Sequence, residues 1–416
     1  MINYASISKY FSCFFLLLLS GCLKSNVSTN LQTPIPMVSP VSSEVASANP
    51  TTMPSEEIST ESVENRIGLL IYSHTPGIGA LFIGESGEIL RNVAAKYSDI
   101  SFSPDKDHIY GFSTFGPDGN GFIVDVLDYS GNILNHRTIQ IDPTYYSLLI
   151  FGLANSPDGK WINYIIPSGD NNFDPRFSSK RDLWLLNIQE EGSQPIKITE
   201  NGGMAIAGGS WSPDGRYLAY TDMDTSGIIQ IFNIDIGTGK KSQLSSFDEG
   251  FRGLEISKIS YSPSGEKLGY IGTYAKEHRG QVGFIKLDKR LTIQAKLPNA
   301  NYIPSTPYFW WSEEGIEMAL LLEGRDLKNI HNNDLIVWFD TNSGEIIRTF
   351  PEKEDIGYVI EIMFPLDDIS RIGFYGFNPK DTDKGASAYS YDIRNKMIKA
   401  LELPDLCCYP YSLVTP

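Results

Sequence analysis

The side chains that could bind a metal ion are few and scattered. The chain has 5 His. No two have the spacing of a ligand pair on one strand or helix, and no His-Glu-x-x-His motif occurs. His74, His278 and His331 fall in equivalent loops of the repeat described below, where they could hold a metal ion for a polysaccharide lyase. Unconnected surface histidines account for the pattern more simply, so we expect no metal ion and no other cofactor.

Hydrolytic chemistry has no clear signature either. A peptidase of the prolyl-oligopeptidase type would need a Gly-x-Ser-x-Gly nucleophile motif, which the chain lacks. Residues 170–174 begin like a calcium-binding loop, but Pro175 and Arg181 stand where that loop needs Gly and Glu. We therefore expect no catalytic residues, and we favour a non-enzymatic function over an enzymatic one.

Aromatic and basic residues gather in segments that we expect to form loops on one face of the molecule. On an acidic chain, a local group of Arg and Tyr has the composition of a recognition patch. Aromatic packing between loops would produce the same pattern, and the sequence does not separate the two interpretations. The ligand-face candidates are Tyr145, Tyr146, Arg176, Phe251, Arg252, His278, Arg279, Tyr302, Tyr308 and Arg325.

The overall composition limits the possible partners. Lys and Arg number 34 and Asp and Glu number 50, which gives a formal net charge of −16. A chain this acidic lacks the electrostatic footprint for nucleic acid, so we expect no nucleic-acid partner. Apolar residues make up 41% and aromatic residues 12%, which is typical of a globular, β-rich protein.

The first residues predict the compartment. Lys9 precedes an apolar run over residues 11–19, which is too short for a stable transmembrane helix and typical of a secretory signal. The run ends in Leu19-Ser20-Gly21-Cys22, which resembles the bacterial lipobox. That resemblance implies a signal peptide over residues 1–21, lipidation of Cys22, and an extracytoplasmic protein anchored in the bacterial cell envelope, either periplasmic or on the cell surface.

Residues 22–65 are expected to form a tether. They follow the predicted lipidation site and are rich in Ser, Thr and Pro, with no apolar period. Such a segment buries too little apolar surface to offset its ordering entropy. We therefore expect an extended, mobile linker that separates a folded body, residues 66–416, from the membrane.

The folded body contains a repeat. A short phrase recurs at Phe102–Asp105, Asn155–Gly159, Trp211–Gly215, Tyr261–Gly265 and Trp311–Gly315, with a degraded copy at Met363–Asp367. Ser-Pro-Asp-Gly is a turn signal, because Pro sets φ, Asp binds its own backbone and Gly accepts positive φ. One strand enters each phrase and an alternating strand follows it. A polar loop then leads to a more apolar strand, and a Gly-containing turn leads to a further strand. These four antiparallel strands in each period of about 50 residues predict an all-β β-propeller.

The Ser-Pro-Asp-Gly phrase followed by an aromatic-rich strand resembles the WD40-like repeat of the TolB-type β-propellers. The resemblance covers nearly all of residues 66–416. It implies the propeller fold but not one function, because that fold serves receptors, scaffolds, lyases and peptidase lids.

The ends of the body are expected to complete one blade together. Residues 66–95 read as the second to fourth strands of a blade, and the tail at residues 407–412 ends in aromatic-Ser like the other phrases. Pairing of these two segments gives seven blades, and it removes open sheet edges. Six blades with an unpaired tail is the alternative.

These patterns favour a membrane-anchored propeller that binds or scaffolds an envelope protein, peptide or glycan. The rival hypothesis is a metal-dependent polysaccharide lyase or hydrolase with its site on the loop face. A third hypothesis, an envelope assembly factor, follows only from the TolB resemblance.

Overall fold

The computed structural model describes most of the folded body. The described residues are 69–72, 80–83, 89–93, 97, 99–102, 108–114, 121–128, 131–140, 151–167, 181–199, 208–274, 276–277, 279–299, 301–324, 334–351, 359–365, 369–377, 387–401 and 413–414. Residues Ser62–Pro416 form one compact unit. None of the helices in these ranges is long and apolar enough to cross a membrane.

The described strands pair into seven four-stranded antiparallel sheets. Sheet 1 contains β1 (Leu69–Tyr72), β2 (Ala80–Ile83), β3 (Ile89–Val93) and β28 (Leu413–Val414). Sheet 2 contains β4 (Asp99–Phe102), β5 (Ile109–Thr114), β6 (Gly121–Leu127) and β7 (Ile133–Gln140). Sheet 3 contains β8 (Phe151–Asn155), β9 (Trp161–Pro167), β10 (Arg181–Asn187) and β11 (Ile196–Lys197).

The remaining sheets repeat this arrangement. Sheet 4 contains β12 (Ser210–Trp211), β13 (Tyr217–Met223), β14 (Ile229–Asp235) and β15 (Lys241–Gln243). Sheet 5 contains β16 (Leu254–Tyr261), β17 (Lys267–Tyr274), β18 (Arg279–Lys286) and β19 (Leu291–Gln294). Sheet 6 contains β20 (Tyr302–Trp311), β21 (Glu317–Gly324), β22 (Leu335–Asp340) and β23 (Ile346–Phe350). Sheet 7 contains β24 (Val359–Pro365), β25 (Arg371–Phe377), β26 (Ser387–Asp392) and β27 (Met397–Leu401).

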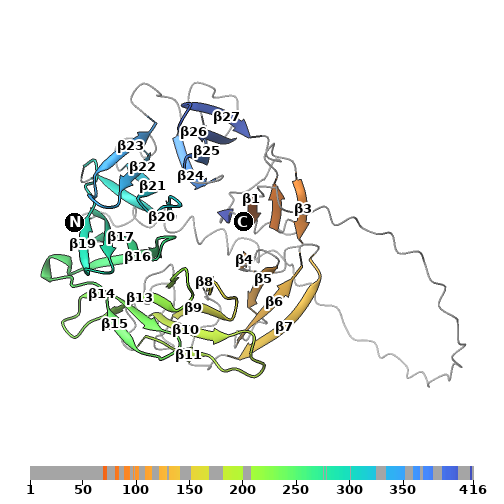
Figure 1. Cartoon of the computed structure of the whole chain (residues 1–416). Helices are drawn as coiled ribbons and strands as arrows, with labels where there is room; N and C mark the ends of the chain where they lie inside the picture. The colour runs from red at the N-terminus through yellow and green to blue at the C-terminus, as the bar shows by residue number, and fades with distance from the viewer. Residues whose placement is uncertain are drawn as a thin grey trace, which may run out of the picture. The chain divides into compact units, whose positions relative to one another are not determined.

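The sheets are arranged radially. The first strands of successive sheets, from β4 to β24, contact one another in chain order. The fourth strands lie on the outside (Figure 1). Sheets that radiate from a common centre with their first strands innermost define a β-propeller, so the fold class expected from the repeat is confirmed.

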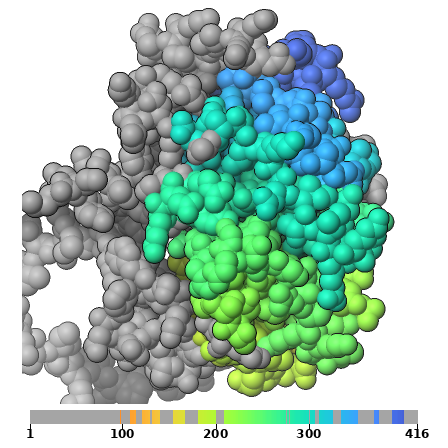
Figure 2. Space-filling model, turned by 90° about the vertical axis from the view of Figure 1, so that its left-hand side faces the viewer, coloured from red at the N-terminus to blue at the C-terminus, as the bar shows by residue number. Residues whose placement is uncertain are grey.

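The core consists of layers between neighbouring sheets. Each described hydrophobic cluster combines residues of two successive sheets, from the pair of sheets 2 and 3 to the pair of sheets 6 and 7. Sheets 4 to 6, which follow one another from green through teal towards blue, are in direct contact on the surface shown in Figure 2. Sheets 3 to 6 are therefore each covered on both faces by a neighbouring sheet.

This double coverage corrects one expectation. The strand after each Ser-Pro-Asp-Gly phrase was expected to alternate between buried and exposed residues. In β13 the five residues from Leu218 to Asp222 are all buried, and in β17 six consecutive residues from Lys267 are buried. Both faces of a middle strand pack against neighbouring sheets, so both sets of side chains leave the solvent.

The Ser-Pro-Asp-Gly turns are built as their chemistry predicts. In the third copy, the Ser212 hydroxyl donates to Asp214 Oδ1 at 2.6 Å and accepts from the Tyr217 N–H at 2.9 Å. Gly215 has φ +70°, a left-handed conformation that glycine adopts without strain. Its α-carbon also faces the preceding turn, since a β-carbon there would stand 3.6 Å from Pro157 Cδ. The turns thus stack on one another along the face opposite the loops.

The C-terminal tail pairs with the first described strand of the body. β28 runs antiparallel to β1, with Leu413 opposite Ile71 and Val414 opposite Leu70. The expected pairing of the two ends is therefore present, although it uses residues just after the predicted 407–412, which lie outside the described residues. Closure of seven blades into one ring stays a prediction.

Candidate functional site

The loop face of sheets 4 and 5 holds three of the five candidate residues that the structure describes, Phe251, Arg252 and Arg279. Leu254, at the start of β16, lies opposite Tyr274, at the end of β17. The connection that enters β16 and the connection that leaves β17 therefore emerge at the same end of sheet 5. The loop between β13 and β14 emerges at the corresponding end of sheet 4.

The connection from sheet 4 to sheet 5 contains a short 3₁₀ helix, η4 (Glu249–Phe251). The Asp248 side chain caps η4 by accepting a 2.9 Å hydrogen bond from the Gly250 N–H. The Phe251 ring stacks on the buried Phe247 ring, with 4.5 Å between their centroids. Phe251 is half-buried, so aromatic packing accounts for part of its role.

A buried amide fixes the segment that leads into η4. Gln230 is 1% exposed, and its Nε2 donates to the Phe247 carbonyl at 2.7 Å and to Asp224 Oδ2 at 3.0 Å. Its Oε1 accepts from the Ser245 hydroxyl at 2.7 Å and from the Phe247 N–H at 2.9 Å. The Gln230 side chain therefore forms hydrogen bonds both with the loop that starts at Asp224 and with the connection to sheet 5.

Arg252, on the solvent side, also joins the loop that starts at Asp224 to the connection that contains η4. Its guanidinium contacts both carboxylate oxygens of Glu249, at 2.5 and 2.7 Å, and donates to the Ser226 carbonyl at 3.0 Å. The hydrogen bonds from Arg252 hold the pKa of Glu249 below its usual range. Because the pair is exposed to solvent, it orients the guanidinium more than it stabilises the fold.

Arg279 and Tyr274 extend this group to the β17–β18 hairpin. The Arg279 guanidinium lies 4.1 Å from the centroid of the Tyr274 ring, and its Nε contacts Glu277 Oε2 at 3.2 Å. The Tyr274 hydroxyl donates to the Gly250 carbonyl at 3.1 Å, which ties the hairpin to η4. Burial raises the pKa of Tyr274, so the hydroxyl stays a proton donor. We call these three joined segments, residues 224–227, residues 248–253 and the described residues 274, 276–277 and 279, the η4 platform.

The two candidate tyrosines of sheet 6 lie in a strand, not in loops. Tyr302 begins β20, at its loop-face end, and its backbone is adjacent to Gly280 of β18. Tyr308 also lies in β20, within the interval between the paired residues Pro304 and Phe309 where the register shifts. Placement in loops was therefore wrong for both. The strand continues from Tyr302 to Trp311 through this irregularity, which the sequence pattern does not reveal.

The remaining candidates lie outside the described residues: Tyr145, Tyr146, Arg176, His278 and Arg325. Cys22 and the predicted tether also lie outside them. The structure brings together Phe251, Arg252 and Arg279, with Tyr302 next to Gly280.

The platform combines positive and negative side chains. The sequence analysis singled out its aromatic and basic residues, and each of its two described arginines contacts a glutamate. Asp224 and Asp248 add further carboxylates that are hydrogen-bonded within the platform. The platform therefore offers paired donors and acceptors instead of surplus positive charge.

Sequence reasoning missed three residues that shape the platform: Asp224, Gln230 and Tyr274. Tyr274 lies directly opposite Arg279 in the hairpin register, so counting the hairpin pairs would have found it. Gln230 carries no such signal, because three of its four hydrogen bonds join it to a segment 15 to 17 residues away whose path the sequence does not specify.

The described part of the chain offers no ready metal centre. Within it, no group of three or more His, Cys, Asp or Glu side chains is placed to hold an ion. His136, in β7, instead contacts Asp125 with 2.6 Å between Nδ1 and Oδ1. His74, His278 and His331 lie outside the described residues.

Comparison with known proteins gives the fold and no family. No protein-family model matches the chain, and no curated protein sequence is similar to it. A solved structure from a study of two prolyl endopeptidases aligns with a TM-score of 0.53 and 13% identity, over 83% of this chain and 51% of that one. A putative TolB from Agrobacterium tumefaciens aligns with a TM-score of 0.42 and 16% identity, over 68% of this chain and 88% of that one.

A third similar structure is an oligogalacturonate lyase in complex with manganese. It aligns with a TM-score of 0.49 and 13% identity, over 78% of this chain and 83% of that one. The endopeptidase match has the highest score of the three, and this chain spans about half of that enzyme's length. At such identities the likeness concerns the fold alone.

Proposed function

We propose that this chain is a lipid-anchored, extracytoplasmic β-propeller that binds a protein, peptide or glycan of the bacterial cell envelope through the η4 platform. In this proposal Cys22 carries the lipid, residues 22–65 form the tether and residues 66–416 form the binding body. The chain acts as a binding or scaffold module and not as an enzyme.

The observation that carries the proposal is the joining of three separate connections into one exposed surface. Arg252 ties the β13–β14 loop to η4, and Tyr274 ties η4 to the β17–β18 hairpin. A surface whose side chains are already held in place loses less entropy when it binds a partner. Arginine and tyrosine are also the residues that most often dominate binding energy at interfaces.

The paired charges favour a partner with mixed polar groups. Each guanidinium of the platform is orientated by its own glutamate, so the surface presents donors next to acceptors. Peptide backbones and glycan hydroxyl groups also present both. A polyanion such as nucleic acid would meet the carboxylates of the platform as well as its arginines.

The binding proposal is tested by capture from an envelope extract. The bait is the predicted mature chain, residues 22–416, with Cys22→Ser, so that it contains neither the predicted signal peptide nor the predicted lipidation site. Arg252→Ala and Arg279→Ala should each reduce capture of the partner. The matched control is Arg216→Ala, because Arg216 also pairs with a carboxylate, Asp235, at 2.9 Å and lies 5.0 Å from a tyrosine ring, but on the opposite face. Equal loss in all three variants, or no loss in any, would contradict the platform as the binding surface.

The anchoring proposal is tested separately. Mass spectrometry of the N-terminal peptide from membranes should show a diacylglyceryl-modified Cys22, and the Cys22→Ser chain should carry no such modification. An unmodified Cys22 thiol in membrane-purified protein would contradict the anchor without affecting the binding proposal.

A further inference from the structure

The longest of the described outer strands is β7, the fourth strand of sheet 2 (Figure 1). It has 8 residues, whereas the other described fourth strands have 2 to 5. β7 pairs with β6 and with no other described strand. In an antiparallel pair, alternate residues of an edge strand direct their N–H and C=O groups away from the partner. β7 therefore presents a row of backbone donors and acceptors at the outside of the propeller.

The side chains of β7 leave this edge open. Ile133 and Leu134 are 46% and 55% exposed, and Asn135 and Thr138 are exposed as well. Proteins block open edges with charged side chains, above all with lysine. The outer strands β11, β15 and β27 each contain a lysine, but β7 contains no Lys, Asp or Glu.

The two basic side chains of β7 are held by groups of the propeller itself. Arg137 is half-buried, and its Nη1 donates to the carbonyl of Asn187, in sheet 3, at 2.7 Å. His136 Nδ1 lies 2.6 Å from Oδ1 of the buried Asp125. The edge therefore has no carboxylate of its own, and both of its basic groups already have acceptors.

One irregularity limits the length of the edge. The register of β6 and β7 shifts between Val126 and Leu127, so Leu134 has no partner residue in β6. Residues 135–140 pair without interruption with residues 121–126. Six residues of β7 therefore form a regular edge, and the exposed Leu134 adjoins it.

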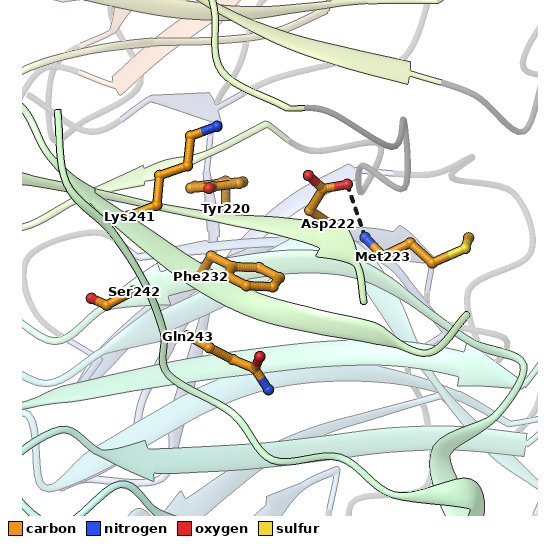
Figure 3. Close-up of a pocket in the computed structure, with 7 residues that line it drawn as sticks. All are labelled: Tyr220, Asp222, Met223, Phe232, Lys241, Ser242 and Gln243. Carbon is orange, nitrogen blue, oxygen red and sulfur yellow. Dashed lines mark hydrogen bonds between the residues drawn. The ribbon is translucent and has the colours of Figure 1, made fainter. Parts of the chain in front are cut away.

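The pocket on sheet 4 is a less suitable docking site. Its volume is about 180 Å³, and Figure 3 shows its lining residues. Lys241 Nζ donates to the Ile198 carbonyl at 2.7 Å, and Asp222 Oδ1 accepts from the Met223 N–H at 2.9 Å. Tyr220 is only 1% exposed. The charged and aromatic groups of the pocket thus belong to the internal structure of the sheets.

We propose that β7 pairs antiparallel with β7 of a second copy of this chain, so that the two copies of sheet 2 form one continuous sheet. Antiparallel pairing of two identical strands has two-fold symmetry, and each copy supplies the same edge. The chain has a net charge of −16, so two copies repel one another, and a strand without carboxylates opposes their approach least. An interface of six residues on each side is small, and the dimer is therefore reversible. The η4 platform, on sheets 4 and 5, is not part of this edge.

Sedimentation equilibrium of residues 22–416 with Cys22→Ser tests the dimer. A reductant is present, so that Cys407 and Cys408 cannot form disulfides between chains. Concentrations from about 1 µM to about 500 µM cover the range in which small, transient interfaces associate. A monomer–dimer equilibrium is expected. A chain that stays monomeric throughout would overturn the proposal and would leave the edge to an extended segment of another protein.

Variants locate the interface. Leu134→Lys should raise the dissociation constant of the dimer at least about tenfold, because a strand added to this edge would have to desolvate the lysine. The matched control is Leu291→Lys, since Leu291 is 50% exposed and lies in β19, the fourth strand of sheet 5. It should dimerise as the parent chain does. Equal weakening by both variants, or by neither, would place the dimer elsewhere and overturn the pairing of β7.

Hydrogen exchange of the parent chain gives a readout that does not depend on the folding of a variant. The amides of residues 133–140 should exchange more slowly in the concentrated, dimeric sample than in the dilute one, and those of β19 should not change. Unchanged exchange of β7 in a dimeric sample would overturn the proposal. Arg252→Ala should dimerise as the parent chain does, so failure of the platform proposal and failure of this one are distinguishable.

Discussion

Gly280 lies directly against Tyr302 across the boundary between sheets 5 and 6. A β-carbon on Gly280 would stand 2.8 Å from the Tyr302 carbonyl oxygen, and it would collide with the Pro304 ring as well. Backbone and a proline ring cannot turn aside as the end of a flexible side chain can. Close packing of β18 on β20 therefore requires glycine next to Arg279 of the platform.

Gly280→Ala should lower the free energy of unfolding by about 1–3 kcal/mol, the usual cost of overpacking. Urea denaturation followed by tryptophan fluorescence measures it. Gly237→Ala is the control, because the nearest atom to a β-carbon there is Asp235 Oδ1 at 3.6 Å, an ordinary contact. Equal stability of the two variants would show that β18 and β20 do not approach this closely.

Asp224 should make the stability of the molecule depend on acidic pH. Hydrogen bonds from the Ser226 hydroxyl, the Ile228 N–H and Gln230 hold the pKa of Asp224 at about 2, below the ordinary 3.8. A lowered folded-state pKa means that the stabilisation is fully present above about pH 4 and is lost as the pH falls towards 2. Asp224→Asn, which keeps the acceptor oxygen, should therefore be less stable than the parent chain at pH 7, and the difference should shrink between pH 4 and pH 2. Thermal unfolding at several pH values measures this, and a pH-independent difference would contradict the assignment.

Ser212 should be the most sensitive position of its turn. Its buried hydroxyl donates to Asp214 and accepts from the Tyr217 N–H, so Ser212→Ala leaves both groups without this partner. We expect a loss of about 1–3 kcal/mol in the free energy of unfolding. Ser246→Ala, at an exposed position of the connection to sheet 5, should stay within about 0.5 kcal/mol of the parent chain. Chemical denaturation of both variants decides the matter, and a silent Ser212→Ala would mean that the turn does not depend on its serine.

The C-terminal strand should close the propeller. Deletion of residues 412–416 removes β28 and leaves unpaired the edge of β1 that faces away from β2. We expect a lower melting temperature and greater aggregation, because the exposed edge of β1 can pair with other chains. Deletion of residues 415–416 alone keeps the pairing and should change neither. An unchanged melting temperature after the longer deletion would favour the six-blade alternative.

The sequence by itself determined the local geometry and the way it recurs. Ser-Pro-Asp-Gly specifies a turn from the conformational limits of Pro and Gly and from the short reach of Ser and Asp side chains. Those causes act within five residues, so they can be recognised in the sequence, as the hydrogen bonds of Ser212 show. Recurrence of the turn at regular intervals then predicted the propeller and the pairing of the two chain ends.

Only the tertiary structure decided which side chains meet. Gln230 and Phe247, Arg252 and Ser226, and Tyr274 and Gly250 are 17 to 26 residues apart. Their contacts depend on the path of the connection between sheets, which no turn chemistry specifies.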